Sequence, residues 1–277
     1  MSGVDGKALG LLQVIVAAAI AGLVLLHYFQ EKLIFFPRGV SQDQLRQLKL
    51  SGSPIEELAM MMLDGTKIKG WIAKGPTAGP MKLIIYYGGN AEELSSMIED
   101  RGKFGDWSLV LMNYRGYGES EGSPGEKKLK RDALEIFDTL IKRPDVNNSK
   151  IVVMGRSLGT GIATYVASQR QTAAVILVSP YDSMLSVAQM HYPFLPVSYM
   201  LKHRFDSAAL ALSIKTPALM LTAASDALIP PAMSKSLADK WGGPVTMRNI
   251  ANTDHNTISF RPEYWDAIKH FLAALDS

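Results

Sequence analysis

The sequence predicts an α/β protein in which a mainly parallel, eight-stranded sheet with helices on both faces follows an N-terminal transmembrane helix. Three observations support this class. Residues 9–26 form a long apolar run without a charged side chain, and an Asp-Gly turn then separates two strand-like segments. Six short apolar runs follow, most of them separated by stretches of helical spacing. Such near-continuous apolar strands between helices are typical of parallel sheets covered on both faces.

The N-terminal segment, residues 1–30, is predicted to be a membrane anchor. No charged residue lies between Lys7 and Glu31, and about 20 apolar residues span the roughly 30 Å hydrocarbon core of a bilayer. Tyr28 suits the membrane interface, so we expect residues 9–29 to contact the lipid bilayer. A cleaved signal peptide and a buried core helix are the alternatives, but the small residues of a cleavage site lie inside the apolar run. Counting only the Lys and Arg residues that flank this segment favours a cytosolic C-terminal domain, whereas counting the net charge at its two ends favours the opposite orientation.

The rest of the chain divides into a polar connector with a short helix, residues 31–54, and a globular domain, residues 55–277. Two strands at 56–63 and 67–73 flank an Asp-Gly dipeptide that favours tight hairpin turns. The further strands are predicted at 83–87, 108–112, 151–154, 174–178, 218–222 and 245–250, with helices such as 126–142 and 159–170 between them. Ligands of such sheets bind beyond the carboxyl ends of the strands, so we expect the functional residues there.

The composition excludes several kinds of site. The 277 residues include no cysteine, which rules out disulfides, thiolate zinc sites, iron–sulfur clusters and a cysteine nucleophile. The formal net charge is only +3, and without a dense basic face it gives no indication of a nucleic-acid partner.

The strongest functional motif is Gly-Arg-Ser-Leu-Gly at residues 155–159. It directly follows the strand at 151–154 and precedes a helix, which is the setting of a G-x-S-x-G nucleophile elbow. A serine on so sharp a turn points its hydroxyl away from the sheet, and the two glycines remove side chains that would collide there. The motif predicts Ser157 as a nucleophile. A glycine-rich turn that binds nothing is the alternative.

A serine nucleophile needs a general base, and the base needs an orienting acid. His255 alone among the five histidines lies in a polar loop between the last strand and the last helix. Asp226 lies in the loop that leaves the strand at 218–222, and the order Ser157, Asp226, His255 fits the motif. Asp182 and Asp254 are the rival acids. We expect Asp182 to cap a helix instead, and Asp254 directly adjoins His255.

Acyl transfer also requires hydrogen-bond donors for the developing oxyanion. The amide N–H of Leu158, directly after the nucleophile, is one candidate. The second is the amide N–H of Asn90, in the Gly-Gly-Asn-Ala segment after the strand at 83–87. An ordinary turn that leads into a helix is the alternative for that segment, and no phosphate-binding pattern follows it.

These motifs resemble the α/β-hydrolase superfamily, and within it the membrane-anchored, Bem-like and α/β-hydrolase-domain serine hydrolases. The resemblance runs in order along essentially the whole chain. Its segments are Glu-Lys-Leu-Ile-Phe-Phe-Pro at 31–37, Gly-Gly-Asn-Ala-Glu at 88–92, Asn-Tyr-Arg-Gly-Tyr-Gly-Glu-Ser-Glu-Gly at 113–122, the elbow at 155–159, Ser-Pro-Tyr at 179–181, Asp226 and His255. Gly88 and Asn113 replace a His and an Asp that many relatives carry, and neither change removes a triad residue or a backbone donor.

The resemblance implies an α/β-hydrolase fold and a serine hydrolase that cleaves esters or thioesters through an acyl-enzyme, without a metal or organic cofactor. The expected substrate is a small-molecule or lipid-like acyl ester. A cap-like insert at about 183–206 has aromatic and aliphatic residues that suit an acyl chain or simple packing. A serine peptidase or acyltransferase on the same triad is one alternative, and a non-catalytic membrane scaffold is another. Arg115 is expected to form a structural ion pair.

Overall fold

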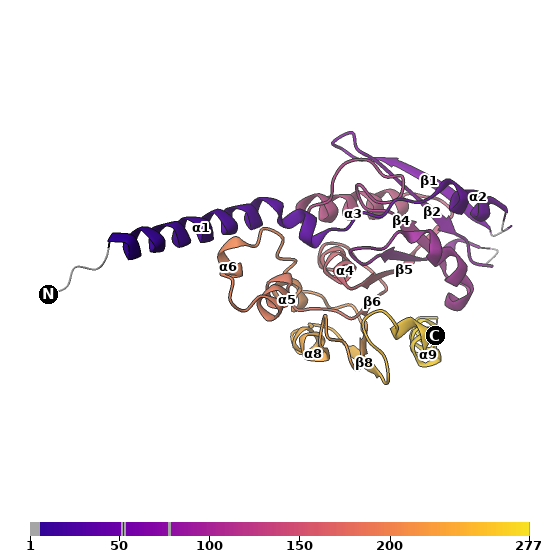
Figure 1. Ribbon diagram of the computed structural model, residues 1–277. Coiled ribbons are helices and arrows are strands. Elements are labelled where there is room, and N and C mark those ends of the chain that lie inside the picture. The colour runs from indigo at the N-terminus through magenta and orange to yellow at the C-terminus, as the bar shows by residue number, and fades with distance from the viewer. Residues whose placement is uncertain (1–5, 51, 53, 77–78, 277) are drawn as a thin grey trace.

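The computed structural model describes residues 6–50, 52, 54–76 and 79–276. Figure 1 shows a long helix, α1 (Gly6–Ile34), that projects from a layered α/β body. The strands are β1 (Ile55–Met61), β2 (Lys67–Ala73), β3 (Met81–Tyr87), β4 (Ser108–Met112), β5 (Val146–Arg156), β6 (Ala174–Val178), β7 (Ala218–Ala223) and β8 (Val245–Ile250). They form one eight-stranded sheet in the order β1-β2-β4-β3-β5-β6-β7-β8.

The sheet is antiparallel at one edge and parallel elsewhere. β1 pairs with β2, and β2 with β4, in antiparallel register, whereas the pairs from β4 through β3 to β8 are parallel. Gly65 turns the hairpin with a φ of 80°, in the left-handed region that glycine enters without steric cost. The predicted mainly parallel, eight-stranded sheet is confirmed.

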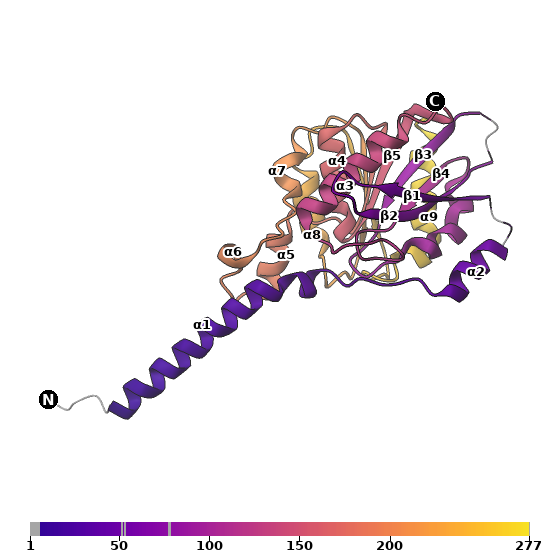
Figure 2. The ribbon, with the colours of Figure 1, turned by 90° about the horizontal axis from the view of Figure 1, so that it is seen from above.

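Helices cover both faces of the sheet (Figure 2). On one face lie α3 (Glu126–Leu140), α4 (Leu158–Gln169), α7 (Ser207–Ala211) and α8 (Pro231–Ala238), and the 3₁₀ helix η1 (Leu94–Phe104) and α9 (Pro262–Ala273) lie on the other. The first face buries a core that includes Leu129, Ile162 and Leu237. Phe104 and Trp265 belong to the core of the second face, with their rings edge to face. The connector contains α2 (Gln42–Leu50), which is the short helix expected there.

The helix α1 changes character along its length. Its stretch Leu9–Ile34 is long and apolar enough to cross a membrane, and most of the side chains that are described there are exposed. Towards its end it meets the body. Gln30 is only 6% exposed, and Phe35, just after the helix, is 2% exposed and belongs to the core.

A cap lies between β6 and β7, and it consists of α5 (Met184–His191), α6 (Val197–Met200) and the loops around them. The expectation that Asp182 caps the first of these helices is wrong by one residue. The Ser183 hydroxyl accepts the Ser186 amide N–H at 3.1 Å and is the N-cap of α5. The Asp182 carboxylate instead accepts the amide N–H of Ser183 at 2.6 Å and the Ser236 hydroxyl at 3.1 Å.

Candidate active site

The candidate nucleophile lies on a strained turn between β5 and α4. Ser157 has a φ of 51° and a ψ of −119°, and the helix begins at the next residue. A Cβ atom on Gly155 would lie 2.4 Å from the Gly159 carbonyl oxygen, and one on Gly159 would lie 2.0 Å from the Tyr87 carbonyl oxygen. Only glycine fits at either position, so the local sequence builds the turn that presents the serine.

The structure brings Ser157, His255 and Asp226 into one hydrogen-bonded chain. His255 Nε2 lies 3.0 Å from Ser157 Oγ, and its Nδ1 lies 2.8 Å from Asp226 Oδ2. The other carboxylate oxygen of Asp226, Oδ1, accepts the amide N–H groups of Leu228 and Ile229 at 3.0 and 2.8 Å. With Nδ1–H donated to the carboxylate, Nε2 faces the serine hydroxyl as an acceptor, which is the arrangement that a general base needs.

Asp226 is held in its ionised form. Burial raises the pKa of its carboxyl, but the hydrogen bonds from His255 and from the Ile229 amide outweigh burial and leave the pKa below the ordinary 3.8. The carboxylate is therefore charged at neutral pH and can stabilise an imidazolium on His255.

Neither rival acid contacts His255 through its side chain among the described residues. Asp182 accepts hydrogen bonds from the Ser183 amide and, at 3.1 Å, from the Ser236 hydroxyl. Asp254 instead accepts the amide N–H groups of the two residues that follow His255, at 2.9 and 3.0 Å. Of the three candidate acids, Asp226 is the one that the fold places beside the histidine.

The two backbone donors expected for an oxyanion belong to residues that line the cavity. Leu158 and Asn90 line the same cavity as Ser157, and neither amide N–H has an acceptor within the part of the chain that the structure describes. Two hydrogen bonds to the Asn90 carbonyl oxygen fix the position of this residue. Its carbonyl oxygen accepts the Phe36 amide at 3.0 Å and the Tyr117 hydroxyl at 2.6 Å. Both N–H groups are therefore available as hydrogen-bond donors to a bound ligand.

Sequence reasoning missed the roles of Arg156 and Glu92, two residues that brace the site. Glu92 accepts the amide N–H of Gly89 at 2.7 Å and the Tyr86 hydroxyl at 2.8 Å, and it pairs with Arg156 at 3.4 Å. Arg156 also donates to the carbonyl oxygen of His255 at 3.1 Å. Burial lowers the pKa of Arg156, but the Glu92 carboxylate more than offsets this and leaves it raised. The one sequence feature that could have indicated these roles is that Arg156 directly precedes Ser157 in the serine motif.

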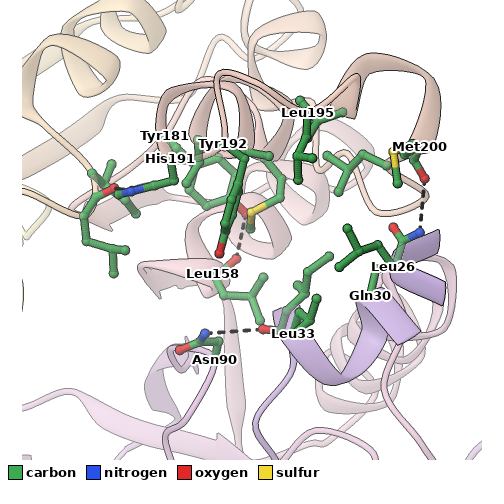
Figure 3. A pocket seen from close by; sticks show the side chains of 18 of the residues that line it. Leu26, Gln30, Leu33, Asn90, Leu158, Tyr181, His191, Tyr192, Leu195 and Met200 are labelled. Atoms are coloured by element: carbon green, nitrogen blue, oxygen red, sulfur yellow. Dashed lines mark hydrogen bonds between the residues drawn. The ribbon is translucent and has the colours of Figure 1, made fainter. Parts of the chain in front are cut away.

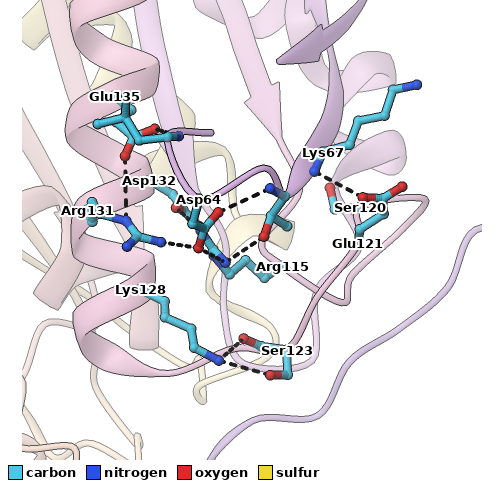
Figure 4. A network of polar contacts seen from close by, with 12 residues as sticks. Asp64, Lys67, Arg115, Ser120, Glu121, Ser123, Lys128, Arg131, Asp132 and Glu135 are labelled. Atoms are coloured by element: carbon cyan, nitrogen blue, oxygen red, sulfur yellow. Dashed lines mark hydrogen bonds and ion pairs between the residues drawn. The ribbon is translucent and has the colours of Figure 1, made fainter. Parts of the chain in front are cut away.

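A second ion pair lies away from the serine and has a structural role (Figure 4). Arg115, 3% exposed, donates to both carboxylate oxygens of Asp132 at 2.5 and 2.6 Å. Its remaining nitrogen contacts Asp64 at 2.8 Å and the Thr66 hydroxyl at 2.9 Å. The group joins the β1–β2 turn to α3, and removing one partner of such a buried pair costs about 3–5 kcal/mol. The expected ion pair of Arg115 is confirmed.

Ser157 is one of the residues that line a cavity of about 630 Å³. Figure 3 shows this cavity, with Leu158 of the serine motif and Met200 of the cap in its wall. Apolar side chains of α1, of the cap and of the loop before α8 form most of its wall. Within the described residues, no group of three or more His, Asp or Glu side chains could hold a metal ion. The cavity is therefore mainly apolar, and Ser157 is part of its wall.

A family model of the α/β hydrolase fold matches residues 85–212. The protein YfhR of Salmonella typhimurium is 30% identical over 222 residues, which cover 72% of this chain and 74% of that protein. The chain belongs to the α/β-hydrolase family. The membrane protein YNL320W of Saccharomyces cerevisiae is 29% identical to this α/β hydrolase and covers 93% of it, with 94% of its own length matched. The protein bem46 of Schizosaccharomyces pombe is 24% identical over an alignment that covers 94% of this chain and 91% of bem46.

Solved structures share the fold of this α/β hydrolase. The Pyrococcus furiosus esterase PF2001 superimposes with a TM-score of 0.67 and 16% identity, over 88% of this chain and 98% of the esterase. At this identity the likeness shows the fold alone. Together with the family assignment, it supports a hydrolase.

Proposed function

We propose that this α/β hydrolase is a membrane-anchored serine hydrolase that cleaves carboxylic esters or thioesters. The observation that carries the proposal is the continuous hydrogen-bonded chain from Ser157 through His255 to Asp226 at one end of an apolar cavity. A serine, a base with the correct acceptor nitrogen and an ionised acid are the three parts that acyl transfer to a hydroxyl requires.

We propose a role for each residue on the basis of this geometry. Ser157 Oγ attacks the acyl carbonyl carbon while His255 Nε2 takes its proton, and Asp226 stabilises the resulting imidazolium. The amide N–H groups of Leu158 and Asn90 hold the oxyanion. His255 then protonates the departing alcohol or thiol, which leaves an acyl group on Ser157. Water, deprotonated by His255, attacks this acyl-enzyme and releases the acid.

Membrane anchoring is part of the proposal, with residues 1–30 as anchor, 31–54 as connector and 55–277 as hydrolase domain. Its support is the exposed apolar surface of α1, which has the length that a bilayer span requires. One relative of nearly the same length, YNL320W, is named as a membrane protein.

The cavity favours an acyl substrate over a peptide. Apart from the proposed triad serine and backbone donors, its wall consists mainly of aliphatic and aromatic side chains, and no Asp, Glu, Lys or Arg among the described residues lines it. A peptide carries polar amide groups along its whole length, and these need hydrogen-bond partners when they are buried. Esters or thioesters with apolar acyl groups need partners only at the reacting carbonyl.

The test uses the full-length protein in detergent with a fluorophosphonate probe, a series of p-nitrophenyl esters and matched peptide amides. We expect the probe to label the wild-type protein but not Ser157→Ala, and esters to turn over faster than amides. Absence of labelling on a folded wild-type protein would indicate a non-catalytic scaffold. Preferential cleavage of amides would indicate a peptidase, and transfer to an added alcohol in place of water would indicate an acyltransferase.

A further inference from the structure

We infer that α1 is part of the substrate site and not only an anchor. Its last turns form one wall of the cavity, and the substrate is a long-chain acyl ester or thioester from the bilayer whose chain lies between α1 and the cap. This inference rests on the proposed function, because it assumes that Ser157 is acylated at the inner end of the cavity.

The first observation is the composition of the wall. Leu26 and Leu33 of α1 line the same cavity as Ser157. Figure 3 shows them on one side of the cavity, with Leu195 and Met200 of the cap on the other. The eight-residue step from Ile34 to Leu26 spans about 12 Å of helix, so the wall is longer than an acetyl group can contact.

The second observation is that hydrogen bonds hold this wall in place. The amide nitrogen of Gln30 donates to the Met200 carbonyl at 3.1 Å, and its oxygen accepts the Lys202 amide at 2.7 Å. His27 Nδ1 lies 2.9 Å from the same Met200 carbonyl. A buried, fully bonded glutamine between two apolar surfaces fixes their register, because leaving its polar atoms without partners would be costly. Helix and cap therefore meet in one defined arrangement.

The third observation is that few polar side chains in the cavity wall are available to form a hydrogen bond with a ligand. Most of its polar side chains already share a hydrogen bond with a backbone carbonyl oxygen, namely those of Gln30, Asn90, Tyr181 and His191. Such a wall stabilises an apolar occupant and offers few partners to a polar one. Its volume of about 630 Å³ lies within the range of roughly 300–1,000 Å³ that is typical of ligand pockets. The occupant that fits is an extended hydrocarbon chain.

The fourth observation concerns where this chain would come from. Leu26 lies at the end of the apolar run that is proposed to span the bilayer. Tyr28 on α1, and Phe194 and Tyr199 on the cap, are 69%, 98% and 91% exposed. Aromatic side chains are favoured at the membrane interface, so this end of the cavity lies beside the lipid from which an acyl chain can enter.

The test compares two tryptophan variants of the full-length protein in detergent. Leu26→Trp places a large ring at the cavity wall. Leu25→Trp places the same ring one residue away, on an exposed side chain that does not line the cavity. We expect the ratio of kcat/KM for p-nitrophenyl hexadecanoate to that for p-nitrophenyl acetate to fall about tenfold or more in Leu26→Trp relative to the wild type. Leu25→Trp should resemble the wild type with both esters.

Each other outcome overturns the inference in a recognisable way. Equal ratios of long-chain to short-chain activity in the two variants would mean that the chain does not lie along α1. A matched loss of both activities in Leu26→Trp would mean that α1 only supports the fold. A wild-type protein that is inert towards both esters and towards a fluorophosphonate would overturn the proposed function and this inference together.

Discussion

Replacing Asp226 with asparagine tests the proposed triad most sharply, because the structure dictates how the new side chain must lie. Asp226 Oδ1 accepts two amide N–H groups, from Leu228 and Ile229, at 3.0 and 2.8 Å. An asparagine must keep its oxygen there, since turning its NH₂ group towards those two donors would break both hydrogen bonds at about 1–3 kcal/mol each. The NH₂ group therefore faces His255 Nδ1, which is 2.8 Å from Oδ2 in the native site.

This orientation gives the histidine the wrong tautomer. Nδ1 must then accept a hydrogen bond, so the proton moves to Nε2, which lies 3.0 Å from Ser157 Oγ. A protonated Nε2 cannot take the serine proton. Loss of the correct tautomer with the geometry intact costs about 10⁴ in kcat in a serine protease, or about 5 kcal/mol of barrier. We expect Asp226→Asn to approach the loss in Ser157→Ala.

The assay is p-nitrophenyl ester hydrolysis together with a thermal melt, and Asp182→Asn is the matched control. An asparagine at Asp182 can still accept the Ser183 amide N–H and can donate to the Ser236 hydroxyl. We therefore expect the control to keep its activity within about twofold and to lose no more than about 1 kcal/mol of stability. An Asp226→Asn protein that retains a tenth of the wild-type kcat, or a folded but inactive Asp182→Asn protein, would refute the assignment.

Three further predictions follow from the same contacts. Gly159→Ala places a Cβ atom 2.0 Å from the Tyr87 carbonyl oxygen. Because this clash displaces the strand end that leads to the proposed oxyanion donors, we expect kcat to fall about 10²–10³-fold. In the control Gly102→Ala, the new Cβ meets nothing within 4 Å, so kcat in the same assay should not change. Hydrogen bonds from Arg115 hold the pKa of Asp64 below its ordinary 3.8, so the carboxylate stabilises the fold above that pH and loses this contribution as the pH falls below it. Melting curves of wild-type and Asp64→Asn protein should differ at pH 7 and converge in acid. Full-length protein should remain with membranes after carbonate washing, and its release would contradict a spanning helix.

The parts of the fold that local pattern determines could be predicted closely. The strands expected at 108–112 and 174–178 have those bounds in β4 and β6, because every side chain in them is buried. The expected strand at 151–154 is longer, since β5 begins at Val146 and passes through polar residues 147–149 that hide it in the apolar pattern. The serine turn was recognisable because Gly155 and Gly159 lie two residues before and two residues after Ser157 in the sequence.

Contacts between distant parts of the chain had no comparable signal. The Gln30 side chain meets residues about 170 positions away in the sequence, and nothing around it distinguishes a residue that packs on a cap from one that faces lipid. For this reason the sequence predicts residues 1–30 as an anchor separate from the globular domain, although Leu26 and Gln30 line the same cavity as Ser157. The choice of Ser183 over Asp182 as a helix cap likewise depends on local backbone geometry that composition does not reveal.

The contacts of Asn90 connect the proposed anchor to the proposed chemistry. Its amide N–H is the proposed oxyanion donor, while its side chain donates to the Ile34 carbonyl at 3.3 Å, at the last residue of α1. Its carbonyl accepts the Phe36 amide at 3.0 Å. A donor of this kind stabilises charge only while it is held within about 0.5 Å of its productive position. Because α1 and the chain just after it hold Asn90, the orientation of α1 and the alignment of the proposed oxyanion donor are set together. The apolar cavity is therefore held at a fixed angle to the helix that is proposed to span the bilayer.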